Sequence, residues 1–289
     1  MAKYKRVAIV GVGLIGGSIG LALRSRGLAG RVVGIGRNGA RLSEAIRFGA
    51  VDEITTDFAE GVAGADVAVV CTPVTGIAEG VRHLAEFGPK GLLVTDAGST
   101  KRAIVEAVER DEASRAVFVG GHPIAGSERQ GVEFADAELF EGRVCALTPT
   151  DRTPAERLER AREFWKAIGC RLIEIDPTTH DAVLALTSHL PHAVASALAA
   201  TVPPENLSLA AGAYRDGTRV AGADASLWAG IFLENREPLL DALGKFQGRI
   251  EAFRRNLEAG DRDALVAWWS RGRSQRLAFD PTRKSGVED

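Results

Sequence analysis

The sequence has little of the features that mark several classes of protein. Its 289 residues include three cysteines and one methionine, and no stretch offers about 18 uninterrupted apolar residues. The basic N-terminus is followed by an apolar run that glycines interrupt, without a small-residue cleavage site. We therefore expect neither a secretory signal peptide nor a membrane partner.

A charge of one sign is also lacking. Lys and Arg number 36 and Asp and Glu number 38, which gives a net charge of −2, and the basic residues are scattered. A nucleic-acid-binding surface needs clustered basic side chains, so we expect no nucleic-acid partner. Cys71, Cys145 and Cys170 lack CxxC spacing and lie in or beside apolar runs, which predicts three reduced, buried thiols and a cytoplasmic location.

The chain has instead the composition of a globular protein, with 45% hydrophobic and 26% charged residues, and a length that suits two domains. From residue 6 to 176, short β-branched apolar runs alternate with runs rich in Ala, Leu, Glu and Arg. This alternation is typical of an α/β domain, in which helices cover a parallel sheet. The predicted strands are 6–10, 31–35, 66–71, 91–96, 116–119, 143–147 and 171–175.

The strand pattern stops after residue 176. The windows 181–200, 227–256 and 262–278 have helical spacing of apolar residues. Pro177 tolerates a first helical turn, and Thr178 or Thr179 could accept a hydrogen bond from an orphan N–H there. We therefore predict an α/β domain over 1–176, an all-α domain over 177–279 and a loose tail over 280–289.

A glycine motif follows the first predicted strand. Gly11, Gly13 and Gly16 form GxGxxG between that strand and a helix predicted over 18–26. In such a loop the first glycine allows a tight turn, the second admits a pyrophosphate and the third lets helix and strand pack closely. We predict a Rossmann-type dinucleotide-binding domain, whose cofactor residues are Gly11, Gly13, Leu14, Ile15, Gly16, Arg37, Thr72 and Pro73.

The end of the second predicted strand bears on the choice of cofactor. NAD-specific folds usually carry an acidic residue there, which binds the ribose 2′-hydroxyl, but this chain has Gly36. Arg37 follows, and its guanidinium could pair with a 2′-phosphate. The pattern predicts NADP as the preferred cofactor and NAD as the second choice. In the alternative interpretation, Arg37 is a solvated surface residue and both cofactors serve.

His122 lies in a GGHPIAGSE segment directly after a predicted strand. Pro123 favours an extended conformation at His122, so we expect an exposed imidazole on a loop at the ligand edge. Histidine titrates near neutrality and suits the removal of a proton from a substrate hydroxyl.

A second group of candidates lies in the helical half. Ser188 and His192 are four residues apart on one predicted helix face, and Pro191 should kink that helix. A metal site is not predicted, because His180, His189 and His192 have no carboxylate or cysteine at ligand spacing on those turns.

Two arginines lie on a polar stretch between predicted helices. Arg215 and Arg219 are candidates for binding a substrate carboxylate, since a guanidinium matches its two oxygens. Alternatively, the stretch is a surface turn with an ion pair to Asp216.

These motifs, in this order and together with the segment 94–101, resemble the prephenate and arogenate dehydrogenase family of tyrosine biosynthesis over nearly the whole chain. The resemblance implies NAD(P)-linked oxidative decarboxylation of prephenate to 4-hydroxyphenylpyruvate, or of arogenate to tyrosine. His122 would accept the proton of the ring C4 hydroxyl while C4 gives its hydride to the nicotinamide. Loss of the C1 carboxylate as CO2 would then aromatise the ring.

The resemblance also implies further roles and a homodimer formed through the helical domain. Ser99 would orient His122 and the cofactor, and Arg219 would hold the ring carboxylate. The pyruvyl side chain would contact His192 with Ser188 beside it, and Ser127 and Trp228 would complete the pocket. The chain has no room for an added regulatory domain, so any inhibition by tyrosine would act at the active site.

Two other functions share part of this pattern. Dehydrogenases of the 3-hydroxyacid type use a lysine in the first long helix of the second domain, but no lysine occurs between Lys166 and Lys245. A non-enzymatic NADP-binding sensor would not need His122 and Arg219 together. The sequence does not distinguish prephenate from arogenate, because they differ only in a keto or amino group.

Overall fold

The computed structural model describes residues 2–126 and 129–279. It forms two compact units, Met1–Leu239 and Leu240–Asp289. The tail predicted over 280–289 lies outside the described residues, and the domain boundary near residue 176 stays a prediction.

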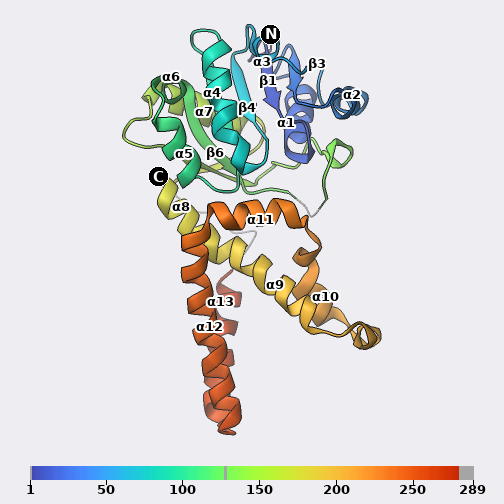
Figure 1. Ribbon diagram of the computed structural model, residues 1–289, viewed down its shortest axis with the longest axis vertical. Helices are drawn as coiled ribbons and strands as arrows, with labels where there is room; N and C mark the ends of the chain where they lie inside the picture. The colour runs from blue at the N-terminus through green and yellow to red at the C-terminus, as the bar shows by residue number, and fades with distance from the viewer. Residues whose placement is uncertain (1, 127–128, 280–289) are drawn as a thin grey trace. The chain divides into compact units, whose positions relative to one another are not determined.

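Over the described part of the chain, one sheet holds eight strands in the order β3-β2-β1-β4-β5-β6-β7-β8 (Figure 1). The seven predicted strands are confirmed. The short edge strand β3 was not predicted, because its three residues are only half-buried and carry no apolar pattern. The strands are β1 Val7–Val10, β2 Val32–Ile35, β3 Glu53–Thr55, β4 Val67–Val70, β5 Leu93–Asp96, β6 Phe118–Pro123, β7 Val144–Thr148 and β8 Arg171–Glu174.

The expectation of a fully parallel sheet is wrong at β7. This strand pairs antiparallel with β6, while β8 pairs parallel with β7. Parallel neighbours need a crossover, usually a helix, and the connection from β6 to β7 contains only the 3₁₀ turn Val132–Phe134 in its described part. The chain therefore returns beside β6 in the opposite direction.

Apolar side chains cover both faces of the sheet. Val7 and Ile9 of β1 belong to a cluster with α1 (Leu14–Ser25), α2 (Gly39–Arg47) and α7 (Ala155–Ala167). Their neighbours Ala8 and Val10 point to the other face, where α3 (Phe58–Val62), α4 (Ile77–Phe87) and α5 (Arg102–Glu109) pack. This two-sided burial explains why the strands read as continuous apolar runs.

The chain after β8 is helical, as predicted. Asp176, rather than a threonine, caps α8, because its carboxylate accepts from the backbone N–H groups of Thr178 and Thr179. The single window predicted over 227–256 is two helices, α11 and α12, separated at Asn235. The helices are α8 Pro177–Leu184, α9 Leu190–Thr201, α10 Gly212–Thr218, α11 Ala225–Glu234, α12 Arg236–Glu258 and α13 Arg262–Ala278.

A π-helical turn, Ala185–His189, joins α8 to α9. The N–H of Leu190 donates to the carbonyl of Ala185, five residues earlier. Pro191 follows at once and has no N–H to offer the carbonyl of Thr187, so the regular ladder is interrupted here. The irregularity predicted at Pro191 thus takes the form of a wide turn just before it.

The run Pro177–Thr201 is long and apolar enough to cross a membrane, judged by length and composition alone. This evidence is weak, because core helices of soluble proteins pass the same test. Here the run carries three buried polar side chains, His180, Asp181 and His189.

The three thiols are free. Cys145 and Cys170 are buried as predicted, and burial raises the pKa of Cys145, which keeps it protonated. The prediction is wrong for Cys71, which is partly exposed. Cys71 follows β4 at the carboxyl edge of the sheet, next to the glycine loop.

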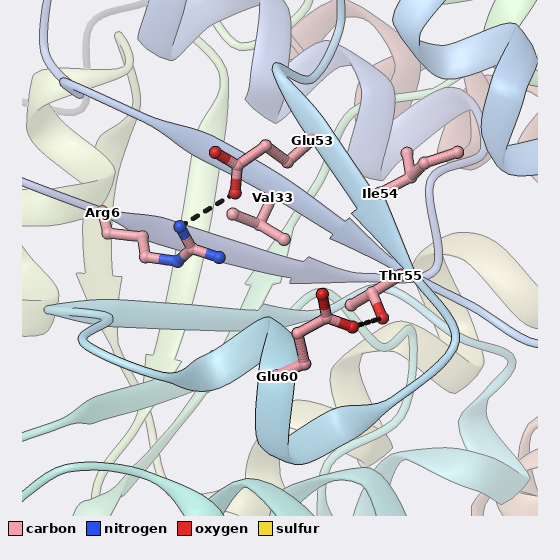
Figure 2. Close-up of a pocket in the computed structure, with 6 residues that line it drawn as sticks. All are labelled: Arg6, Val33, Glu53, Ile54, Thr55 and Glu60. Carbon is pink, nitrogen blue, oxygen red and sulfur yellow. Dashed lines mark hydrogen bonds and ion pairs between the residues drawn. The ribbon is translucent and has the colours of Figure 1, made fainter.

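A hollow of about 230 Å³ lies beside β2 and β3 (Figure 2). Two polar pairs lie in it, since Arg6 bonds Glu53 at 2.9 Å and Thr55 donates to Glu60 at 2.5 Å, although Arg6 Nε has no partner within the described residues. It shares no residue with the site described below.

Candidate active site

The glycine loop has the geometry that its three glycines predict. Gly11 has a φ of +89°, and a Cβ there would lie 3.0 Å from the backbone of Cys71. A Cβ on Gly16 would lie 2.2 Å from the carbonyl oxygen of Gly11, whereas one on Gly13 would meet no atom within 4 Å. The open space at Gly13 is where a pyrophosphate would approach the backbone.

The residues around this loop also fit a dinucleotide. Helix α1 begins at Leu14 and Ile15, and Gly13 before it supplies no side-chain cap, so first-turn N–H groups are available to an anion. Thr72, after β4, has a buried hydroxyl oxygen without a hydrogen-bond partner in the described chain. Buried hydroxyls normally find partners, so this one fits a polar group of a ligand. Pro73, next to it, is exposed.

Arg37 lies at the same edge of the sheet. The residue before it, Gly36, follows β2 directly, and the N–H of Gly11 donates to Ile35 at the end of that strand. Arg37 is exposed, and Asn38 beside it caps α2. Because residue 36 is a glycine, the end of β2 offers no carboxylate at that position to bind a ribose 2′-hydroxyl.

A buried ion pair between Asp96 and Lys101 connects the end of β5 to β6. Asp96 ends β5, Lys101 precedes α5, and both side chains have an exposed fraction of 0%. The Asp96 carboxylate pairs with Lys101 Nζ and accepts from the N–H groups of Gly98 and Gly121, each at 2.9 Å. Lys101 Nζ also donates to the Gly121 carbonyl at 2.9 Å. The pair therefore fixes the backbone directly before His122.

His122 is in strand β6 and is 8% exposed, so the expectation of an exposed imidazole on a loop is wrong. The strand extends through Pro123 because it pairs with β7, where Pro123 faces Cys145. Burial lowers the pKa of His122 well below its usual value, and the nearby His180, Lys101 and His189 lower it further. The ring is therefore held neutral, which suits a base.

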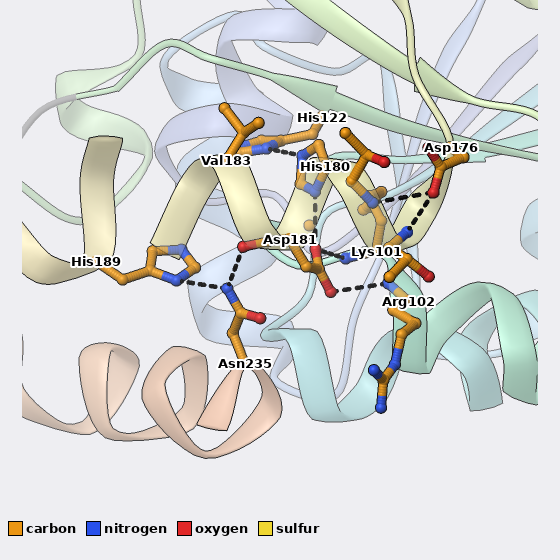
Figure 3. A network of polar contacts seen from close by, with 12 residues as sticks. Lys101, Arg102, His122, Asp176, His180, Asp181, Val183, His189 and Asn235 are labelled. Atoms are coloured by element: carbon orange, nitrogen blue, oxygen red, sulfur yellow. Dashed lines mark hydrogen bonds and ion pairs between the residues drawn. The ribbon is translucent and has the colours of Figure 1, made fainter. Parts of the chain in front are cut away.

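Two residues of α8 extend from His122 in a chain of hydrogen bonds (Figure 3). His122 Nδ1 lies 2.9 Å from His180 Nε2, and His180 Nδ1 lies 2.7 Å from Asp181 Oδ1. The Asp181 carboxylate also accepts from the backbone N–H groups of Lys101 at 2.8 Å and Arg102 at 2.9 Å. We refer to Asp181, His180 and His122 as the relay.

Asn235 connects the relay to another histidine. Its Nδ2 donates to the backbone carbonyl of Asp181 at 2.8 Å and lies 2.9 Å from His189 Nδ1. Since an amide nitrogen only donates, His189 Nδ1 accepts. Burial lowers the pKa of His189 to about 4, so this ring is also neutral.

His192 and Trp228 form the side of the site carried by α9 and α11. Their rings stack with centroids 3.6 Å apart and an angle of 23°. His192 Nδ1 donates to the Ser188 carbonyl at 2.8 Å, which leaves Nε2 as the acceptor nitrogen. The pKa of His192 is lowered by burial and, to a smaller extent, by the nearby charge of Arg219. The structure thus brings together four of the predicted substrate residues.

Three further residues predicted for the site are Ser99, Arg215 and Ser127. Ser99 is half-buried in the loop between β5 and α5, whereas the partner found for the His122 ring is His180. Arg215 pairs with Asp216 at 3.4 Å, and the two side chains are 80% and 76% exposed, as in the alternative interpretation of that stretch. Ser127 lies outside the described residues. Over residues 2–126 and 129–279 there is no group of three side chains placed to hold a metal ion.

Two family models match the chain in succession. The model of the prephenate dehydrogenase nucleotide-binding domain matches residues 19–174, and that of the prephenate dehydrogenase dimerization domain matches residues 176–271. The chain belongs to the prephenate dehydrogenase family. The resemblance found in the sequence motifs is thereby confirmed.

Individual family members match almost the whole of this chain. The prephenate dehydrogenase of Bacillus subtilis is 34% identical over 97% of this chain and 77% of its own. The cyclohexadienyl dehydrogenase of Zymomonas mobilis is 32% identical over 96% of this chain and 97% of its own. The crystal structure of Aquifex aeolicus prephenate dehydrogenase with hydroxyphenyl propionate and NAD+ has a TM-score of 0.89 and 35% identity, covering 96% and 98% of the two chains.

The relay and the Asp96–Lys101 pair were not predicted from the sequence. In the sequence, the segment 94–101 contributes to the family resemblance with a role only for Ser99, and the helix that begins near His180 contributes without a catalytic role for His180. The available signal was the helix start after Asp176, which places His180 and Asp181 in the first turns of α8.

Proposed function

We propose that the chain catalyses the oxidative decarboxylation of prephenate or arogenate with a nicotinamide dinucleotide as hydride acceptor. The observation that carries the proposal is a buried, neutral His122 in the same compact unit as a glycine loop that fits a dinucleotide. Membership of the prephenate dehydrogenase family supports the reaction, and its relatives include a cyclohexadienyl dehydrogenase.

In this reaction His122 Nε2 removes the proton of the ring C4 hydroxyl. The bound nicotinamide would supply the hydride acceptor for C4. Arg219 holds the ring carboxylate until the bond from C1 to it breaks, when its electron pair enters the ring and CO2 leaves. His122 then returns its proton to the phenolate oxygen, so no proton is gained or lost. The protein contributes mainly orientation, because aromatisation drives the step.

The remaining predicted residues hold the substrate and the cofactor. His192, with Ser188 beside it, contacts the side chain of the substrate through Nε2, and Trp228 packs against the His192 ring. Ser99 contributes to the nicotinamide side, and Ser127 to the substrate pocket. The cofactor lies on Gly11, Gly13, Leu14, Ile15 and Gly16, with Thr72 and Pro73 at the neighbouring strand end.

The purified protein should reduce the cofactor when mixed with prephenate or arogenate. Four mixtures, each substrate with NAD+ and with NADP+, are followed by the absorbance of the reduced cofactor. Turnover with one substrate confirms the reaction and identifies that substrate. If no cofactor is reduced in any of the four mixtures although cofactor binding is measurable, the result would favour the non-enzymatic sensor.

We propose NADP as the preferred cofactor. Exchange of Arg37 for alanine should raise the KM for NADP+ about tenfold, since loss of a guanidinium–phosphate pair costs on the order of 1.4 kcal/mol. The KM for NAD+ should change less than about twofold. Arg47→Ala, in the last turn of α2, whose N-cap Asn38 directly follows Arg37, is the matched control. An equal rise of the KM for NADP+ and the KM for NAD+ in Arg37→Ala would contradict the preference for NADP.

The activity should persist at lower pH than an ordinary histidine base allows. His122 must be neutral to accept a proton, and burial lowers its pKa, so it stays neutral below the ordinary value of 6.5. Activity is then lost only as the pH falls through this lowered pKa. We expect the acid limb of the kcat/KM profile, measured over pH 4 to 9, to lie well below pH 6.5. This profile reports the pKa values of groups in the free enzyme. A limb at or above 6.5 would contradict a neutral, buried His122.

We further propose a homodimer, formed through the helical domain over 177–279, and a cytoplasmic location. Support for the dimer comes from large apolar side chains on the surface of α13, such as Trp269, which is 68% exposed. The free thiols fit a reducing compartment.

A further inference from the structure

We infer that His180 and Asp181 are positioning residues that fix the tautomer of His122, so that its free lone pair is on Nε2. The inference rests on the proposed role of His122 as the base. It assigns to the relay the orienting role that the family resemblance gives to Ser99.

The first step concerns Asp181. Two backbone N–H groups, those of Lys101 and Arg102, each donate to one oxygen of its carboxylate. Asn235 holds its backbone carbonyl from the other side, so the residue is fixed at three points. A carboxylate held by donors is itself only an acceptor. The nitrogen that faces it, His180 Nδ1, therefore carries the proton of this 2.7 Å hydrogen bond.

The second step gives the position of the proton on His122, which faces His180. A neutral imidazole has a single N–H, and His180 uses it toward Asp181, so His180 Nε2 is an acceptor. His122 Nδ1 must then donate across the 2.9 Å contact. The lone pair of His122 is left on Nε2, the nitrogen that would take the substrate proton.

The relay also stabilises the charge that forms. When His122 has accepted a proton, its Nδ1–H still points at the His180 lone pair, and the Asp181 carboxylate lies one ring further on. The charged and titratable groups around His122 are His180 and Asp181 on α8, His189 on the π turn, Asp96 at the end of β5, Lys101 before α5 and Cys145 on β7. Of these, only His180 bonds the His122 ring within the described residues. Replacing His180 should therefore change the tautomer of His122, whereas replacing the other groups should not remove a bond to the ring.

The test reads the tautomer directly. The chain has five histidines, so ¹⁵N-histidine NMR of the full-length protein gives few signals, and the His122→Asn spectrum assigns one of them. We expect the Nδ1–H form of His122 in the natural protein. His180→Phe keeps a ring but removes the acceptor, and should shift His122 toward the Nε2–H form and lower kcat about 100-fold. Cofactor affinity should change less than about twofold.

Two further variants separate positioning from packing. His180→Gln can place an amide oxygen near the former Nε2 position, so it should restore much of the kcat and the Nδ1–H form. His83→Phe, the same exchange on α4, should leave both unchanged.

Two outcomes would overturn the inference. One is an Nε2–H form of His122 in the natural protein, which remains measurable even if the His180 variants do not fold. The other is a folded His180→Phe variant with kcat within about threefold of the natural value. Absence of turnover with either substrate would instead contradict the proposed function, since the NMR result does not depend on activity.

Discussion

Replacing His122 with asparagine should lower kcat about 10³- to 10⁴-fold and leave the affinity for the cofactor within about twofold. Asparagine approximates the shape of the imidazole near Cβ but has no lone pair that can take a proton at the position of Nε2. The side chain is buried in β6, whereas the glycine loop proposed to hold the dinucleotide follows β1. The loss should therefore fall on the chemical step.

The assay for this variant is steady-state turnover combined with cofactor binding by fluorescence titration. His83→Asn on α4 is the matched control and should keep the natural kcat. If His122→Asn keeps more than about a tenth of the natural kcat, His122 is not the base. If it loses cofactor affinity to the same extent as kcat, its role is structural.

Replacing Lys101 with methionine should destabilise the fold by about 3–5 kcal/mol. The exchange nearly preserves the volume of the side chain but leaves the Asp96 carboxylate charged, fully buried and without its cationic partner. It also removes the donor to the Gly121 carbonyl, next to His122. The free energy of unfolding, measured by urea denaturation, should therefore fall together with kcat.

The same exchange at Lys245 is the control. Lys245 pairs with Asp241 on the surface of α12, where both side chains are more than half exposed, and such pairs contribute little. The double variant Lys101→Met with Asp96→Asn should recover part of the lost stability, because it removes the unpaired charge. A Lys101→Met protein as stable as the Lys245→Met protein would contradict the importance of the buried pair.

The parts that depend on short-range pattern could be predicted from the sequence. The buried strand β1 and the glycines after it lie within ten residues, and each constraint is local: an apolar run, a positive φ at Gly11, a close contact at Gly16. The helical second half followed from spacing in the same way. The family resemblance rested on such local motifs and their order.

The relay could not be predicted in this way. Its contacts join residues 58 and 80 positions apart, His122 to His180 and Lys101 to Asp181, and no local pattern marks them. The burial of His122 depended on β7, whose antiparallel pairing extends β6 through Pro123. A Gly-Gly-His-Pro segment reads as a loop when its pairing partner is unknown. Asn235 could not be predicted either. It separates α11 from α12, but the apolar spacing continues across it, so the sequence predicts a single helix there.

The π turn sets how the length of this chain can vary. A π turn holds about one residue more than a regular turn, so loss of a single residue within Ala185–His189 would restore an ordinary helix and leave the helices on either side in nearly the same rotation. A residue inserted before His189 has no such slack and would rotate everything after it by about 100° about the helix axis relative to His180 and Asp181. His192 would then leave Trp228, and His189 would leave Asn235. Between His180 and His189 the gene can therefore accept the loss of one codon more readily than the gain of one.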